Sequence, residues 1–169
     1  MNTFDKVLAA AMVIVFVLAG LAVTQAVRAS DYNGDRFCMA QNIYFEAANQ
    51  PLAGRIAVSN VVLNRVADGQ FPDTICGVVY QSKYEENWKG NMVPVLYKCQ
   101  FSWYCDGKSD EPTDSKTWME AIRLADRVLD NTYVDITEEA LWYHADHVDP
   151  YWNDYLNQTV EINNHIFYK

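Results

Sequence analysis

The sequence predicts a mainly helical α+β domain with a small β element, preceded by an N-terminal hydrophobic helix. Three observations predict this fold class. Apolar residues recur at helical spacing in several segments between residues 36 and 131. Two short extended segments follow at the C-terminal end. An uncharged run, residues 7–27, lies near the start. A chain of 169 residues is long enough to bury a core as one domain.

The uncharged run is long enough to cross a bilayer as a helix. We therefore expect residues 1–29 to form a transmembrane signal-anchor or a cleaved signal peptide, with weak cleavage signals at 24–26 and 27–29. In either case residues 30–169 are exported. The expected location is the cell envelope, periplasmic or extracytoplasmic, with the protein anchored in the membrane through residues 7–27 or secreted.

A polar linker is expected over residues 29–35, and a first helix over 36–48. Pro51 suits the first turn of a second helix, about residues 52–66. Because apolar residues occupy most of the circumference of that helix, it is expected to be the central buried one. A short helix over residues 74–81 follows.

Residues 82–112 are expected to be irregular, and a loop of this length inside a domain is often functional. Asp114 or Ser115 can cap a helix over residues 116–131. Its core-facing stripe is Trp118, Ile122, Ala125 and Leu129. Extended segments are expected at 140–144 and 160–168.

The second of these segments contains Asn163-Asn164, which predicts a turn between two short strands. The net charge of −9, from 22 acidic and 13 basic residues, repels phosphate backbones and argues against a nucleic-acid partner. Aromatic residues make up 14% of the chain, which argues against disorder. Those in loops line sugar or peptide clefts, or fill the core.

The four cysteines, Cys38, Cys76, Cys99 and Cys105, all follow the uncharged run. In an exported domain they predict two disulfides, with three possible connectivities. Cys99 and Cys105 can close a short loop, and Cys38 and Cys76 bracket two antiparallel helices. These spacings favour Cys38–Cys76 and Cys99–Cys105. Zinc binding is the rival use, but the chain has no Cys-x-x-Cys spacing.

Glu46 is a lone carboxylate among aromatic and small apolar neighbours. On a helix it forms a narrow polar stripe with Asn42 and Asn49. Poor solvation beside Tyr44 and Phe45 would raise its pKa, as a general acid near neutral pH requires. An exposed helix glutamate is the alternative interpretation.

Two other segments combine groups that can bind a substrate. The loop CQFSWYCDG, residues 99–107, joins aromatic rings, hydroxyls and an amide inside a possible disulfide. The segment WYHADH, residues 142–147, lies at the end of an expected strand.

Together with these segments, an ordered series of blocks resembles the SleB-type cell-wall hydrolases, relatives of the spore-cortex-lytic enzymes. The resemblance spans residues 38–169. The blocks are IYFEA, PLAGRIAV, VLNRV, FPDTI, CQFSWYCDG, YHADHVDPYW and NHIFYK.

The resemblance implies a lysozyme-like or lytic-transglycosylase-like α+β domain that cuts the glycan strands of peptidoglycan, with Glu46 as catalytic residue. It implies no cofactor and no metal, and we expect a monomer. The candidate substrate-binding residues are Tyr44, Ser102, Trp103, Tyr143 and His144. The family pattern Glu-Ala-Arg-Gly-Glu reads EAANQ over residues 46–50 here, which puts affinity or turnover in question.

Most glycosidases use two carboxylates. The candidates for a second one, Asp106 and Glu111, are interpreted as a turn residue and a solvated loop charge. With a single carboxylate, the C6 hydroxyl of muramic acid can replace water. The favoured reaction is therefore that of a lytic transglycosylase, in cell-wall remodelling or phage-driven lysis, with true hydrolysis as the alternative.

Three rival functions remain at this point. His144 and His147, three residues apart with Asp146 between them, could hold zinc in a wall amidase, and His165 is the only other histidine. A cysteine could act as nucleophile with a histidine base. The altered EAANQ segment is also compatible with a non-catalytic, membrane-tethered peptidoglycan-binding domain.

Overall fold

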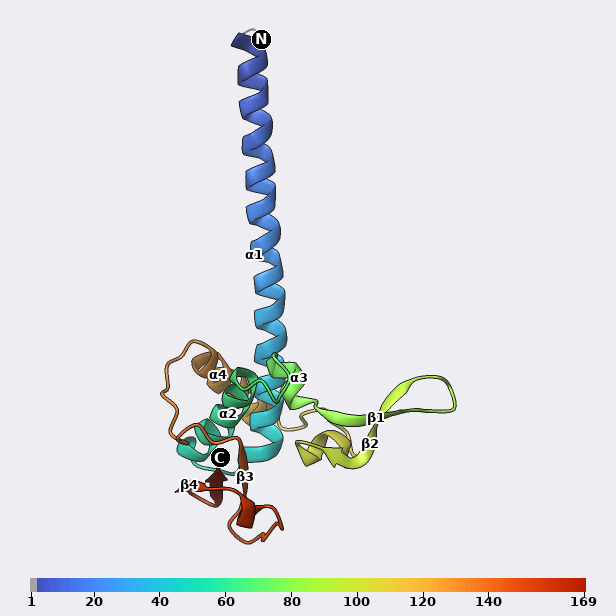
Figure 1. Ribbon diagram of the computed structural model, residues 1–169, viewed down its shortest axis with the longest axis vertical. Coiled ribbons are helices and arrows are strands. Elements are labelled where there is room, and N and C mark those ends of the chain that lie inside the picture. Colours follow the sequence, from blue (N-terminus) through green and yellow to red (C-terminus); the bar gives the residue numbers. More distant parts are fainter. Residues whose placement is uncertain (1–2) are drawn as a thin grey trace. The chain divides into compact units, whose positions relative to one another are not determined.

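The protein is described by a computed structural model that covers the backbone of residues 3–169, and the side chains of 14–24 and of 33–169. The chain divides into two units, Met1–Gly34 and Asp35–Lys169. Helix α1, Thr3–Ala47, includes the segment expected to be a linker (Figure 1). That prediction is wrong because nothing in residues 29–35 breaks a helix. The segment has no proline, and its one glycine costs only about 1 kcal/mol.

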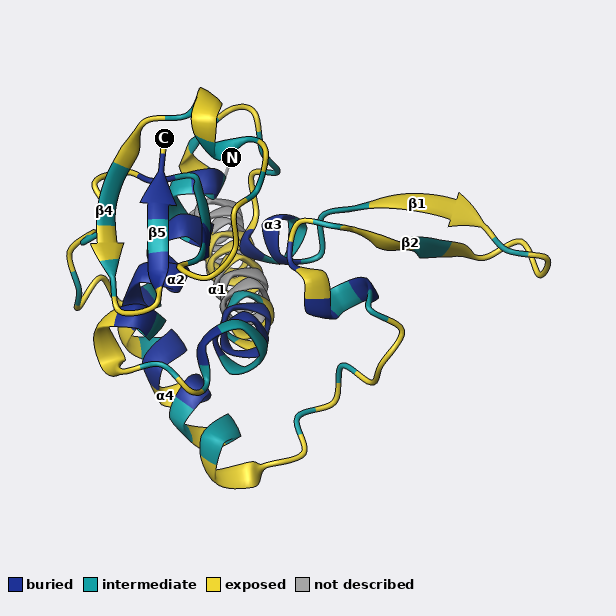
Figure 2. Ribbon diagram, turned by 90° about the horizontal axis from the view of Figure 1, so that it is seen from below, coloured by how far each residue is buried: buried dark blue, intermediate teal, exposed yellow. Residues whose placement is uncertain are grey.

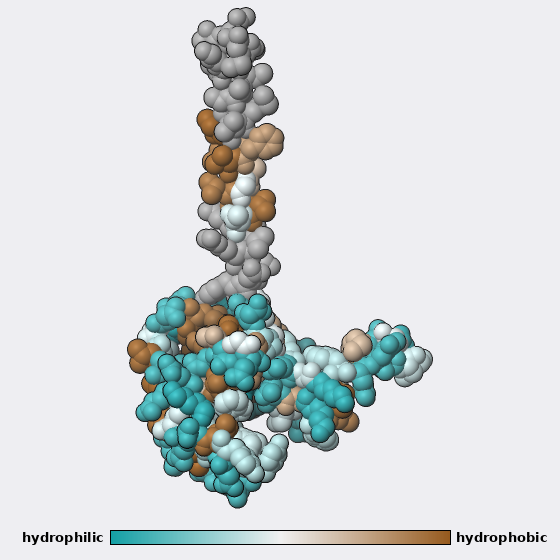
Figure 3. Space-filling model, viewed as in Figure 1, coloured by the Kyte–Doolittle hydropathy of each residue, from teal (hydrophilic) through white to brown (hydrophobic). Residues whose placement is uncertain are grey.

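The predicted membrane span lies partly outside the residues whose side chains are described, which leave out 7–13 and 25–27. In the described stretch, apolar side chains are exposed, and they appear brown in Figure 3. These are Ile14, Val15, Phe16, Val17, Leu18, Leu21 and Val23. Within the part that could be searched, no helix meets the length and hydropathy needed to cross a bilayer.

The helices of the second unit follow the predicted order: the end of α1, α2 (Leu52–Ala67), α3 (Ile75–Val79) and α4 (Ser115–Leu129). The prediction of a central buried helix is confirmed for α2, whose residues 56–62 are all buried. Thr74 caps α3 and Asp114 caps α4, each by accepting a backbone N–H. Both helices therefore start where the sequence offers an N-cap.

The main core is shared by all four helices. Met39 and Ile43 of α1 are buried, and so are Val62 of α2 and Val78 of α3. From the stripe expected on α4, Ile122 and Ala125 are buried, while Trp118 and Leu129 pack at the edge of the core. The Cys38–Cys76 disulfide ties α1 to α3 beside this core.

A three-stranded antiparallel sheet covers α2 on another side. Its strands are β3 (Trp142–Ala145), β4 (Gln158–Ile162) and β5 (His165–Tyr168), in the order β3-β5-β4 (Figure 2). The predicted turn is confirmed at Asn163, which has a φ of 54°. Phe167 of β5 is fully buried against Ala57 and Val61 of α2.

The segment expected to be irregular contains a β-hairpin, so that prediction is wrong over its first half. Strands β1 (Ser82–Glu86) and β2 (Met92–Cys99) pair and project from the body of the unit (Figures 1 and 2). The hairpin escapes pattern analysis because it has no buried face to impose alternation, and Pro94 within β2 argues against a strand. Two short 3-10 helices, η1 (Ser102–Cys105) and η2 (Asn153–Tyr155), complete the unit.

Candidate active site

Glu46 lies in the last turn of α1, and it lines a cavity of about 360 Å³. The helix is oriented by Met39, Ile43 and Ala47, which are all at most 1% exposed on its core-facing side. Of the polar stripe expected on this helix, Asn42 is fully buried, Glu46 lines the cavity and Asn49 lies beyond the end of α1. The cavity is lined by Phe45, Glu46, Ser102, Trp103, Asp106, Lys108 and Ser109.

The carboxyl group of Glu46 is held by a single side chain from the sheet. The Tyr143 hydroxyl donates a hydrogen bond of 2.9 Å to Glu46 Oε2. Burial raises the pKa of Glu46 above its ordinary value, and it outweighs the Tyr143 hydrogen bond and the charge of Arg65, which both lower that pKa. The carboxyl is thus biased toward the protonated form that a general acid needs.

Arg65 is a functional candidate that sequence reasoning missed. The residue is 4% exposed, and its Nε donates to the backbone oxygen of Leu141 at 2.8 Å. The guanidinium carbon lies 5.2 Å from the ring centroid of Phe71 and 5.3 Å from that of Phe101. The signal was a cationic residue in the most thoroughly buried helix.

Arg65 and the Glu46 carboxyl are close enough to affect each other's pKa. Burial lowers the pKa of the guanidinium, whereas the neighbouring Tyr143 and Glu46 raise it. Its Nη1 atom is buried and has no hydrogen-bond partner among the described residues. Arg65 is therefore a buried cation with an uncommitted donor, close enough to Glu46 to favour its ionised form.

One wall of the cavity is built by η1, which lies inside the Cys99–Cys105 disulfide loop. The Trp103 ring stacks on Phe45 at 4.8 Å, and its Nε1 donates to Asn42 Oδ1 at 3.3 Å. Asn42 is buried one turn before Glu46. Ser102 is exposed in the same wall, so Ser102 and Trp103 both lie in the cavity with Glu46.

Asp106 brings a second carboxyl group into the cavity. It forms the turn that the sequence indicates, since its Oδ1 accepts the Lys108 N–H at 2.9 Å. Its other oxygen pairs with Lys108 Nζ at 3.2 Å. These hydrogen bonds lower the pKa of Asp106, so one cavity holds two carboxyls whose pKa values are moved in opposite directions.

The structure does not bring Tyr44 and His144 into this cavity. The Tyr44 hydroxyl accepts the N–H groups of Thr113 and Asp114, just before the first residue of α4. His144 is 9% exposed, and its ring nitrogens lie 2.9 Å from the Ala145 oxygen and the Tyr168 hydroxyl. Their contacts in the structure are with protein groups that shape the domain.

The positions where the family pattern changes also lie outside the cavity lining. Asn49 and Gln50 belong to the turn between α1 and α2, where Arg55 Nε donates to the Gln50 backbone oxygen at 3.0 Å. Ala48 precedes them and directly follows the end of α1. None of the three is among the residues that line the cavity around Glu46.

The rival site chemistries find little support in the geometry. All four cysteines are paired, as Cys38–Cys76 and Cys99–Cys105, the pairs that the sequence favoured, so no thiol is available as a nucleophile. Among the described residues, no group of three or more His, Cys, Asp or Glu side chains is placed to hold a metal ion. His147 is exposed and pairs with Asp146 instead.

Comparison with known proteins gives this site a family context. A family model described as Cell Wall Hydrolase matches residues 49–168, which is most of the chain and begins three residues after Glu46. The spore cortex-lytic enzyme of Oceanobacillus iheyensis is 42% identical over 45 residues, which cover 27% of this chain and 16% of that protein. The Bacillus subtilis enzyme is 37% identical over 49 residues, or 29% and 16%. The matched stretch thus spans about a sixth of these relatives.

Two solved structures match much more of the chain. The catalytic domain of the Bacillus cereus SleB protein is 28% identical, with a TM-score of 0.57 over 81% of this chain and 91% of that one. The catalytic domain of the germination-specific lytic transglycosylase SleB from Bacillus anthracis is 29% identical, with a TM-score of 0.57 over 80% and 93%. The α+β prediction is therefore confirmed, and the chain belongs to the Cell Wall Hydrolase family.

Proposed function

We propose that this chain cleaves the glycan strands of bacterial peptidoglycan, with Glu46 acting first as general acid and then as general base. The observation that carries the proposal is the position of Glu46. Its carboxyl lies in a cavity, has a raised pKa and accepts a hydrogen bond from Tyr143. Membership of the Cell Wall Hydrolase family and the likeness to a lytic transglycosylase domain support it.

In the first step the protonated Glu46 donates its proton to the glycosidic oxygen. The bond to the leaving sugar breaks, and positive charge develops at the anomeric carbon. The carboxylate left on Glu46 is stabilised by the Tyr143 hydroxyl and by the charge of Arg65. Both groups act more strongly on the carboxylate than on the acid, so they favour the proton transfer.

In the second step Glu46 takes a proton from the C6 hydroxyl of muramic acid, whose oxygen attacks the anomeric carbon. The product carries a 1,6-anhydro ring, and Glu46 regains its proton. The reaction consumes no water and needs no cofactor. This is the lytic transglycosylase reaction that a single acid/base can perform.

Asp106 provides the observation in favour of the second candidate reaction, hydrolysis. Its carboxylate lies in the same cavity and is kept ionised by its hydrogen bonds and by Lys108. A second carboxylate can stabilise the oxocarbenium-like centre or activate a water molecule. Mass spectrometry of the products separates the two reactions, because hydrolysis leaves reducing ends and transglycosylation leaves anhydro-muramic ends.

The decisive experiment compares the complete chain with Glu46→Gln on purified sacculi. The unaltered protein should release soluble fragments, and Glu46→Gln should lower the rate at least a hundredfold, since general acid catalysis contributes about 10²–10⁴-fold. Circular dichroism serves as the folding control. Full activity of Glu46→Gln would remove the proposal, and sacculus binding without any product would support a non-catalytic binding domain.

We also propose that residues 7–27 tether the domain to a membrane, where it acts as a monomer in remodelling or phage-driven lysis. The exposed apolar side chains over residues 14–23 support the tether. Deletion of residues 1–29 should move the protein from the membrane fraction to the soluble fraction. An unchanged distribution would contradict the tether without touching the catalytic proposal.

A further inference from the structure

The three-stranded sheet has a second face that the proposed reaction does not use. Side chains alternate along β3, so Tyr143 reaches Glu46 while Trp142 and His144 emerge on the opposite side. Trp142 is paired in register with Tyr168 of β5. We call the side that carries Trp142, His144 and Tyr168 the outer face.

The outer face borders a hollow of about 390 Å³ that is rich in aromatic residues. It is lined by Gln100, Trp142, Tyr151, Trp152, Tyr155 and Leu156. An adjoining hollow of about 670 Å³ shares Trp142 and Leu156 with it. We call the two hollows together the outer groove. No residue that lines the outer groove also lines the cavity of Glu46.

The aromatic rings of the outer groove are of two kinds. Trp152 is fixed, because it packs edge-on against the rings of His144 and Tyr168, each at 5.6 Å. Tyr151 and Tyr155 are 85% and 82% exposed. Exposed tyrosines beside the fixed Trp152 offer flat apolar surfaces with polar edges, which is the arrangement that stacks on the C–H faces of sugar rings.

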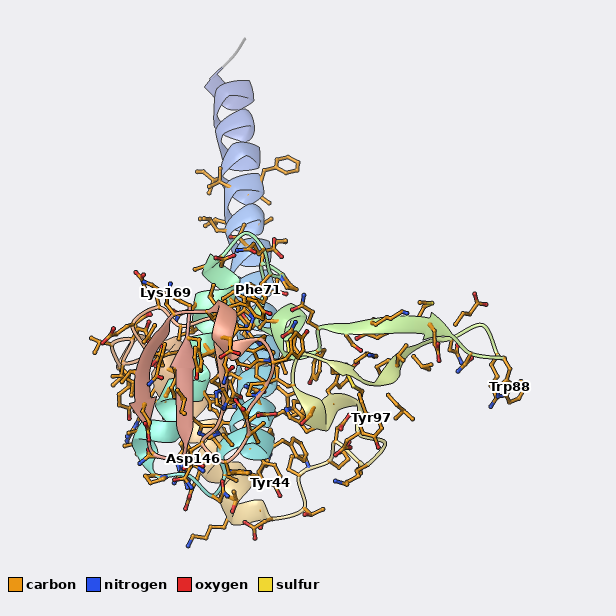
Figure 4. All side chains as sticks on the ribbon, turned by 60° about the horizontal axis from the view of Figure 1, so that its bottom comes forward. Tyr44, Phe71, Trp88, Tyr97, Asp146 and Lys169 are labelled. Atoms are coloured by element: carbon orange, nitrogen blue, oxygen red, sulfur yellow. A yellow bond between two sulfur atoms is a disulfide. The ribbon has the colours of Figure 1, made fainter. Side chains whose placement is uncertain are left out.

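The wall of the larger hollow supplies polar groups but almost no free positive charge. It includes the amide of Gln70 and the carboxyl of Asp68, while the Asn64 amide nitrogen is already bonded to Asp135, Thr137 and Ala140. Its one cation, Lys169, pairs with Glu139 at 3.0 Å. Such a wall can hydrogen-bond hydroxyl and acetamido groups but does not attract polyanions. Figure 4 shows Lys169 at the opposite end of the body from Tyr44, which neighbours Glu46 in α1.

We propose that the outer groove is a second saccharide-binding site, which holds a stretch of uncharged glycan away from the bond being cleaved. The identification of that glycan as part of a peptidoglycan strand rests on the proposed function. A polymer held at two places leaves the enzyme more slowly than a fragment held at one, because the second contact is intramolecular. The site would keep the enzyme on insoluble wall while short products depart.

The test uses the complete chain carrying Glu46→Gln, so that binding is measured without cleavage. Tyr151→Ala/Tyr155→Ala should weaken co-sedimentation with purified sacculi about tenfold, as expected for two lost aromatic contacts. Trp88→Ala is the matched control, because Trp88 is an 88% exposed aromatic in the β1–β2 turn, outside the groove lining. It should leave binding unchanged.

A second measurement uses the same tyrosine substitutions with Glu46 intact. Cleavage of short soluble glycan strands should stay within about twofold of the unaltered chain, while release from sacculi falls. The proposal would be overturned if Trp88→Ala weakened sacculus binding as much as the tyrosine substitutions do, or if the parent chain did not bind sacculi. It would also be overturned if the tyrosine substitutions slowed cleavage of short strands as much as release from sacculi, or changed the oligomeric state seen in light scattering. If the unaltered chain cleaves nothing and the tyrosine pair still controls binding, the groove stands and the proposed function fails.

Discussion

The Tyr143 hydroxyl donates a hydrogen bond to Glu46 Oε2 across 97 residues of sequence, joining the end of α1 to strand β3. Arg65 of α2 reinforces this junction, since its Nε holds the Leu141 backbone oxygen two residues before Tyr143. The pKa of this carboxyl on α1 therefore depends on groups from two other elements, α2 and β3. This arrangement makes the pH behaviour of the protein testable.

Glu46→Gln should stabilise the fold at neutral pH. Burial raises the folded-state pKa of Glu46 above its ordinary value of 4.5, so the folded state resists ionisation of this group. Below the ordinary pKa the carboxyl is protonated in both the folded and the unfolded state, so its ionisation does not change the free energy of unfolding. As the pH rises through the folded-state pKa, the unaltered chain loses stability relative to Glu46→Gln.

Thermal unfolding at about pH 4 and about pH 8 measures this difference. The midpoints of the two proteins should converge at the lower pH and separate at the higher one. Glu111→Gln, at an exposed loop carboxyl, is the control and should show no such divergence. A Glu46→Gln protein that is less stable at the higher pH would contradict the prediction.

Tyr143→Phe should move the alkaline limb of the pH–rate profile to higher pH. The Tyr143 hydrogen bond favours the carboxylate and lowers the pKa of Glu46. Its loss therefore raises that pKa, and the protonated form of Glu46 persists to higher pH. The rate at the optimum should fall about tenfold, because a hydrogen bond to a developing charge contributes about 1.5 kcal/mol.

The control for this substitution is Tyr84→Phe, since the Tyr84 hydroxyl bonds Tyr80 and Tyr104 outside the cavity lining. Its pH–rate profile should match that of the unaltered protein. A limb in Tyr143→Phe that stays in place, or moves to lower pH, would show that the hydroxyl does not act on the Glu46 carboxylate during the reaction.

Arg65 should have two separable roles. Arg65→Met removes the positive charge, so the pKa of Glu46 should rise and the alkaline limb of the pH–rate profile should move to higher pH. It also leaves the Leu141 carbonyl without its donor, which should lower the unfolding free energy by about 1–3 kcal/mol. Arg65→Lys should keep the limb near its original position while losing part of that stability.

Urea unfolding and pH–rate profiles measure the two roles independently. Arg55→Met, on the same helix but paired with Glu120 at 3.5 Å, is the control and should not move the limb. If Arg65→Lys shifts the limb as far as Arg65→Met does, the charge of Arg65 is not what acts on Glu46.

The two disulfides should differ in what their removal costs. Cys38→Ala/Cys76→Ala opens a link across 38 residues and should lower the unfolding free energy by about 4 kcal/mol in the chain-entropy model. Cys99→Ala/Cys105→Ala spans 6 residues and should cost about 2 kcal/mol. The second pair should nevertheless reduce activity more, because its loop carries Ser102 and Trp103 in the cavity wall.

Activity is compared at a temperature where both variants remain folded, as shown by circular dichroism. Loss of Cys38–Cys76 should cost more stability, whereas loss of Cys99–Cys105 should cost more activity. Similar activity loss in both variants would mean that the Cys99–Cys105 loop does not need its link to shape the cavity.

The elements that the sequence predicted well are those with a strong local signal. The helix expected at 116–131 appears as Ser115–Leu129 because its apolar stripe faces one core and Asp114 accepts the Thr117 N–H. The turn at Asn163 follows from the ease with which asparagine adopts a positive φ. The hairpin of β1 and β2 was missed because its residues are mostly exposed and carry no alternating pattern.

By itself, the sequence determined the order of the helices and the disulfide pairs that were favoured, because these depend on spacing along the chain. Glu46 as the catalytic acid was implied by the resemblance to the SleB-type cell-wall hydrolases. Only the tertiary structure decided which groups meet that acid. Tyr143 and Arg65 approach it, Asp106 enters its cavity, and His144 lies on the other side of the sheet. Periodicity shows which face of an element is buried, but contacts between distant elements depend on how those buried faces pack together.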